Sequence, residues 1–156
     1  MDEQNRDEAA ARFIERIGQI VEQDGLTRIA GRIFGYLLLS SEAHSLEDLA
    51  KAVQASKGSI SQETRLLERL GALERVTRAG DRRVFYQIGD RMMGRMVALR
   101  IERFAQLREA MAEGSRVADD AAVRARLSAF VDFHDHLLST MREAQDRWCR
   151  GHGIET

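Results

Sequence analysis

The chain of 156 residues carries 24 basic and 25 acidic residues, and 44% of its residues are hydrophobic. This length and balance fit one globular domain with helical extensions and argue against a disordered chain. The amino terminus is acidic, no apolar run approaches the roughly 20 residues that cross a bilayer, and a single cysteine excludes an internal disulfide. We therefore expect a cytoplasmic protein without membrane association.

The near-neutral total conceals an uneven distribution of charge. Residues 1–50 hold 5 basic and 10 acidic residues, residues 51–86 hold 8 and 4, and residues 87–156 hold 11 and 11. A basic segment in a nearly neutral chain is typical of a protein that binds a polyanion. The chain also has no proline, which suits a mostly helical protein because proline breaks helix interiors.

Apolar residues at helical spacing predict two helices at the start of the chain. The first covers about residues 8–23 and ends at Gly25. The second covers about residues 26–39 and carries Gly31 and Gly35, whose spacing is typical of close helix packing in a soluble core.

Two short helices joined by a tight turn follow. Ser45 is suited to cap the third helix, Ala55-Ser56 forms the turn, and the fourth helix runs to Leu70 before Gly71. Two short helices with such a turn are typical of a helix-turn-helix.

The hydrophobic period then changes from 3.6 to about two residues. Residues 73–78 and 84–88 are predicted as short strands, and residues 79–82 supply the turn. A hairpin directly after a helix-turn-helix is a wing. The predicted fold class is mostly α with a small β-hairpin wing, a winged helix-turn-helix with terminal helices that form a dimerisation region.

Two further helices complete the chain, over about residues 90–113, capped by Asp90, and residues 119–149, with a break at Gly114-Ser115. Apolar residues of the last helix alternate four and three apart, a heptad seam longer than a small winged domain can cover. The seam residues are Val123, Leu127, Phe130, His134, Leu137, Met141, Ala144 and Trp148. With Phe13 and Ile17 they form the predicted dimer interface.

The predicted organisation has three parts. Residues 1–25 form an N-terminal dimerisation helix, residues 26–89 the winged helix-turn-helix DNA-binding domain, and residues 90–156 a C-terminal helical dimerisation region.

The fourth helix has a polar, basic face opposite its apolar one. At 100° per residue, Ile60 and Leu67 lie on one side, whereas Ser61 and Arg65 lie on the other. Hydroxyl, amide and guanidinium groups are those that contact base edges and phosphates. The predicted DNA contacts are Lys57, Ser59, Ser61, Gln62, Arg65 and Arg69 of the helix and Arg82 and Arg83 of the hairpin tip.

Three residues near this face leave alternatives open. The helix cap is either Ser56 or Ser59, since Ser59 also forms a capping box with Gln62. Glu63 falls on the apolar side and needs a partner, such as an arginine of the second helix. Asp81 suits a DNA-facing tip only where it orients a neighbouring arginine.

Residues 46–88 resemble the MarR family of winged helix-turn-helix regulators. The resemblance rests on residues 56–61 (SKGSIS), 66–71 (LLERLG), 73–76 (LERV) and 81–83 (DRR), while residues 24–26, 28–32 and 35–38 resemble its GbsR branch. It implies a dimer with an interface of terminal helices and effector pockets near the DNA-binding lobes. It also implies DNA contacts by Lys57, Ser59, Ser61, Gln62 and Arg65, with Arg82 or Arg83 in the minor groove.

These observations predict a homodimeric, sequence-specific regulator of transcription that binds double-stranded DNA at a palindromic operator. It acts as a repressor or an activator, of which we favour a repressor. A small-molecule effector is a further expectation. Its pocket would be lined by Gly31, Gly35, Met93 and Met96, although neighbouring side chains filling the space at the glycines is an equal alternative.

Two other functions stay open. One is a winged-helix protein-interaction module without DNA binding. The other is a metal- or redox-sensing repressor that uses His134, His136, Asp132 or Cys149. No catalytic residue, cofactor or metal site is predicted, and we do not expect an enzyme, because the sequence has no phosphate loop or nucleophile elbow.

Overall fold

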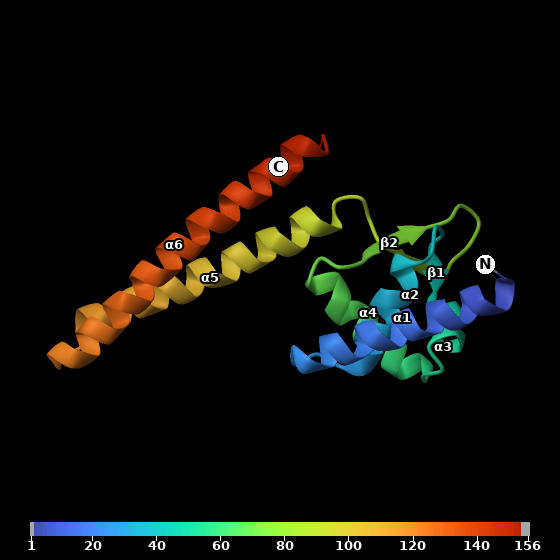
Figure 1. The fold of residues 1–156 in the computed structure, drawn as a ribbon, viewed down its shortest axis with the longest axis horizontal. Helices are drawn as coiled ribbons and strands as arrows, with labels where there is room; N and C mark the ends of the chain where they lie inside the picture. The colour runs from blue at the N-terminus through green and yellow to red at the C-terminus, as the bar shows by residue number, and fades with distance from the viewer. Residues whose placement is uncertain (1, 154–156) are drawn as a thin grey trace. The chain divides into compact units, whose positions relative to one another are not determined.

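The computed structural model describes residues 2–153, so Met1 and residues 154–156, which the predicted terminal regions include, lie outside the described part. The chain is mostly helical with one small antiparallel sheet, which confirms the predicted fold class. It divides into two compact units, Met1–Met92 and Met93–Thr156 (Figure 1). No helix in the described part is long and apolar enough to span a membrane.

The first unit combines four helices with the sheet. Its elements are α1 (Glu3–Gln23), α2 (Arg28–Leu38), β1 (His44–Ser45), α3 (Leu46–Ala52), α4 (Lys57–Arg69), β2 (Glu74–Thr77) and β3 (Val84–Gln87). The central strand β3 pairs antiparallel with β2 to form the predicted hairpin and with β1 on its other edge. The short β1 was not predicted, because two residues cannot display an alternating pattern.

One hydrophobic core joins these elements. Its most deeply buried residues are Ala30, Ile33, Leu37, Leu49, Val53, Ile60, Leu67, Leu73 and Phe85, none more than 3% exposed. They come from α2, α3, α4 and β3, with Val53 directly after α3 and Leu73 directly before β2, so the helix-turn-helix and its wing form a single packed body.

Helices α1 and α2 approach each other at two glycines. A Cβ atom on Gly31 would lie 2.7 Å from the Cα atom of Gly18, and one on Gly35 would lie 3.2 Å from the Cα atom of Ile14. Two ion pairs flank the contact, from Arg28 and Arg32 to Glu15. Helix α1 therefore occupies the space at both glycines. The sequence leaves two alternatives open for that space, neighbouring side chains or an effector.

The turn between α3 and α4 is short and sharply bent. Gln54 adopts a left-handed backbone with φ of 52°, a conformation uncommon for a residue other than glycine. The backbone N–H of Ser59 then donates to Ser56 Oγ at 3.1 Å. Ser56 is therefore the cap of α4, and the alternative box of Ser59 with Gln62 does not form because Ser59 lies inside the first turn.

The second unit is a hairpin of two long antiparallel helices, α5 (Met92–Val117) and α6 (Ala121–Gly151) (Figure 1). Arg108 binds the Asp135 carboxylate through two hydrogen bonds of 2.9 Å. The predicted break at Gly114-Ser115 is wrong, since α5 continues to Val117. A Cβ on Gly114 would touch Leu127 at 3.4 Å, so this glycine packs against α6 rather than ending the helix.

Changing Gly31 to alanine should test the contact between α1 and α2. We expect Gly31→Ala to lower the free energy of unfolding by about 1–3 kcal/mol, because the new methyl group meets backbone atoms. Gly58→Ala is the control, because its Cβ would meet only Ser56 Oγ at 3.9 Å and alanine favours helix. Urea unfolding measures both, and equal stability of the two variants would contradict the close approach.

Candidate nucleic-acid interface

Helix α4 buries one side and exposes the other. Ile60, Thr64 and Leu67 are at most 3% exposed, whereas Gln62 and Arg65 are exposed. Of the other predicted contacts on this helix, Arg69 is exposed, and Ser59 and Ser61 are half-buried. Among residues 2–153, no side chain pairs with the Arg65 guanidinium. The helix thus presents hydroxyl, amide and guanidinium groups outward from a fixed base.

The first residue of α4, Lys57, is held by a carboxylate of α3. Its Nζ atom donates to Glu47 Oε1 at 2.5 Å, and both side chains remain more than half exposed. The hydrogen bond and the charge of Lys57, with a smaller contribution from Arg83, hold the pKa of the Glu47 carboxyl below its usual value. The positive charge of this lysine is therefore balanced by a carboxylate of the same chain.

The tip of the wing contains one arginine in an ion pair and one without. Arg83 donates from its guanidinium to both carboxylate oxygens of Asp81, and its backbone N–H adds a further hydrogen bond of 2.9 Å to Asp81 Oδ1. The hydrogen bonds from Arg83 lower the pKa of Asp81 to about 2. Asp81 therefore orients a neighbouring arginine. Arg82 is exposed and has no partner within the described part of the chain.

Cation–π contacts hold the turn of the wing. The Arg78 guanidinium lies 4.2 Å from the centre of the Phe85 ring and donates to the Ala43 carbonyl at 2.9 Å. The Arg83 guanidinium lies 5.2 Å from the same ring. Since Phe85 belongs to the core, these contacts tie the hairpin to the body of the first unit.

A cleft of about 320 Å³ lies between α4 and the wing. Its lining includes four basic residues, two acidic residues and several polar and apolar groups. They are Ser45, Leu46, Glu47, Lys57, Ser61, Arg65, Glu68, Arg75, Arg83, Val84 and Tyr86. The cations outnumber the acids, so the cleft suits a polyanion.

Glu63 is an unusual residue on the buried side of α4. It is 5% exposed, and its Oε2 atom has no hydrogen-bond partner. The prediction that an arginine of α2 pairs with it is wrong, because Arg28 and Arg32 both pair with Glu15 of α1. The carboxylate is therefore a cost to the core rather than part of an ion pair.

The predicted heptad seam of α6 divides into two rows. Leu127 packs against Gly114, and the ring of His134 lies 5.7 Å from that of Phe104, so this row faces α5. Met141 and Leu137 are half-buried and Ala144 is exposed. The other row, which we call the outer row, consists of Val123, Phe130 and Trp148. These side chains are between 38% and 43% exposed.

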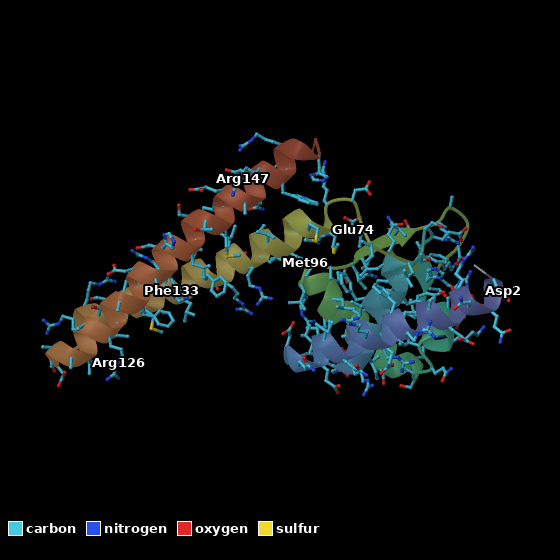
Figure 2. All side chains as sticks on the ribbon, in the orientation of Figure 1. Asp2, Glu74, Met96, Arg126, Phe133 and Arg147 are labelled. Carbon is cyan, nitrogen blue, oxygen red and sulfur yellow. The ribbon has the colours of Figure 1, made fainter. Side chains whose placement is uncertain are left out.

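Phe133 lies beside the outer row and was not predicted. It is 62% exposed, more than Val123, Phe130 and Trp148 of the seam, and its place on α6 is marked in Figure 2. A heptad count misses it because it falls between two seam positions. On α1, the predicted interface residue Phe13 is 36% exposed and Ile17 is half-buried.

The histidines and the cysteine occupy separate environments. His134 is buried among Phe104, Phe130 and Phe133, and its Nδ1 atom lies 2.9 Å from the Phe130 carbonyl. Cys149 is buried. Within residues 2–153, no three His, Cys, Asp or Glu side chains are grouped as a metal site would require. Of the methionines predicted to line an effector pocket, Met93 is 47% exposed and Met96 is half-buried (Figure 2).

Comparisons with known proteins bear on this interface. No family model matches the chain. The chain is 33% identical over 144 residues to the HTH-type transcriptional regulator MmpR5 of Mycobacterium tuberculosis (strain ATCC 25618 / H37Rv), covering 90% of this chain and 87% of that protein. A crystal structure of a transcriptional regulator is 32% identical with a TM-score of 0.84, covering 91% of this chain and 99% of that one. The crystal structure of the S. aureus MepR–DNA complex is 23% identical, covering 70% of this chain and 90% of that one, with a TM-score of 0.42.

Replacing the buried Glu63 should reveal its cost. We expect Glu63→Met to raise the free energy of unfolding by about 1–2 kcal/mol at neutral pH, because it removes a buried oxygen without a partner. Glu68→Met on the same helix is the control, with a change within about 0.5 kcal/mol, because its ion pair with Arg75 spans 4.0 Å at the surface. A less stable Glu63→Met variant would show that the carboxylate has a stabilising partner.

Proposed function

The chain belongs to the family of HTH-type transcriptional regulators, which bind DNA, and from that premise we propose that it is a homodimeric repressor acting at a palindromic operator in the cytoplasm. We place it in the GbsR-like branch of the MarR family on the residues that resemble that branch. The observation that carries the proposal is the outward face of α4, where Arg65 is exposed beside a wing that carries the exposed Arg82, and neither arginine has a partner within residues 2–153.

The two elements would make different contacts with DNA. Ser61, Gln62 and Arg65 suit base edges in the major groove, since Arg pairs with guanine and Gln with adenine. Lys57, Ser59 and Arg69 suit phosphates. For the minor groove we favour Arg82 over Arg83, because Asp81 already binds the Arg83 guanidinium and Arg is attracted to the negative potential there.

The sparse core of the second unit supports the proposed dimer. Among residues 93–153, the buried side chains are Ile101, His134, Leu138 and Cys149. Most helix stability in proteins comes from packing of an apolar face, and the outer row of α6 has no such cover within this unit. We propose that a second copy of the chain covers Val123, Phe130, Phe133 and Trp148. Two-fold symmetry would then present two copies of α4 to a palindrome.

The effector response stays a prediction. Helix α1 occupies the space at Gly31 and Gly35, so a ligand pocket lined by these glycines would require α1 to move. The rival function, a protein-interaction module without DNA binding, has less support, because the relatives are transcriptional regulators.

Substitution of Arg65 tests base recognition. We expect Arg65→Ala to weaken binding to the preferred site by about 1–3 kcal/mol and to relax base preference at one position of each half-site. Arg65→Lys keeps the charge and loses the bidentate geometry, so its base preference should relax as well. Selection of bound sites from a random library measures both variants. Unchanged preference in both would assign Arg65 to phosphate contact only, and no duplex binding by the wild type would overturn the proposed function.

A charge placed at Phe133 tests the dimer. We expect Phe133→Asp to shift the protein from dimer to monomer in light scattering and to weaken operator binding by about 100-fold or more, because bivalent binding is lost. Ser139→Asp introduces the same charge at an exposed polar position on a different side of α6 and should remain dimeric. A wild-type protein that is monomeric at micromolar concentration would contradict the proposal.

A further inference from the structure

Most of the positive charge in the cleft is already paired. Each of three cations has an acidic partner: Lys57 with Glu47 at 2.5 Å, Arg83 with Asp81 at 2.7 Å, and Arg75 with Glu68 at 4.0 Å. Two of these acids, Glu47 and Glu68, line the same cleft. The surface that would receive the DNA backbone therefore carries its own counterions.

Glu47 has the most central position of these acids. It projects from α3, and its carboxylate accepts a hydrogen bond from Lys57, the first residue of α4. Its charge also acts on Arg83 of the wing. Glu47 thus faces cations from both elements that flank the cleft, whereas Asp81 is a neighbour of Arg83 in the chain and Glu68 lies at the limit of an ion pair.

The pair of Lys57 and Glu47 is also free to open. The side chains are 63% and 52% exposed, and the described contacts of each side chain are with the other. An exposed pair of this kind is held weakly. A phosphate group, which presents the same anionic oxygen chemistry to an ammonium group, can replace the carboxylate without disturbing the core.

We propose that Glu47 is an internal competitor of DNA phosphate, which holds Lys57 in the free protein and must release it when the DNA backbone binds. The inference rests on the proposed function, since it requires Lys57 to reach a phosphate. Glu47 then lowers the affinity for any duplex by a constant factor and leaves base preference unchanged. Glu47 also makes the fall of log affinity with log salt shallower. A lysine that exchanges a carboxylate for a phosphate neutralises less new charge in the complex than a lysine that is unpaired in the free protein.

The first test measures binding of a random-sequence duplex, so that no operator has to be known. We expect Glu47→Gln to bind about twofold to fivefold more tightly at low salt, the size of one exposed ion pair. The plot of log affinity against log salt should steepen by up to about one unit for each Lys57 that meets a phosphate. Glu42→Gln removes the same charge from an exposed position whose carboxylate has no cation partner in residues 2–153, and it should change neither quantity beyond a small general effect.

A double-mutant cycle identifies the mechanism. In a Lys57→Gln background, Glu47→Gln should give no more gain than Glu42→Gln, because no lysine is left to release. Unchanged or weaker binding by Glu47→Gln alone, or a full gain without Lys57, would overturn the proposal. If the wild type binds no duplex at all, the proposed function fails instead. Binding by the wild type without the Glu47 effect leaves that function standing and removes only the competitor.

Discussion

The buried side of α4 limits what its outer side presents. Ile60, Thr64 and Leu67 are fixed in a core that also holds α2 and the sheet, so the helix cannot rotate without exposing them. Side chains on the opposite side therefore point outward in a set orientation. The cap at Ser56 and the left-handed residue Gln54 fix where the helix begins. Together they hold Arg65 and its neighbours in one register relative to the wing.

The same rigidity explains why the local charges are arranged in pairs. Cations gathered at the end of a helix and on a nearby hairpin repel one another. Glu47, Glu68 and Asp81 offset that repulsion at distances between 2.5 and 4.0 Å. Under the proposed function, binding of DNA would be an exchange of anions at cationic positions that are already formed in the free protein.

Much of the first unit follows from sequence periodicity, because its helices and hairpin each bury one regular face. The features that sequence missed depend on contacts between elements. Two residues of β1 pair with β3 only because the chain before α3 returns to the sheet. An arginine of α2 was expected to pair with Glu63, but Arg28 and Arg32 both form ion pairs with Glu15 of α1. Gly114 continues a helix because Leu127 packs on it.

The second unit shows where periodicity is ambiguous. A heptad pattern identifies an apolar stripe without saying which part faces the adjacent helix and which part faces another molecule. Leu127 and His134 meet α5, whereas Phe130 remains 38% exposed. A wide stripe on a two-helix hairpin serves two neighbours, and only the intramolecular one can be assigned from one chain.

The proposed dimer and the proposed competitor depend on each other physically. Under the proposal, the pair of Lys57 with Glu47 lowers the affinity of one lobe for duplex DNA, since the phosphate contact of Lys57 first has to displace a carboxylate. A single lobe would then dissociate readily from an isolated half-site. In a dimer, once one lobe is bound, the other lobe meets the second half-site at a high effective concentration. A low affinity of each lobe is therefore a disadvantage only where a single half-site is present. Charge balance in the cleft and an uncovered row on α6 would together favour palindromes over single sites, although neither feature reads a base.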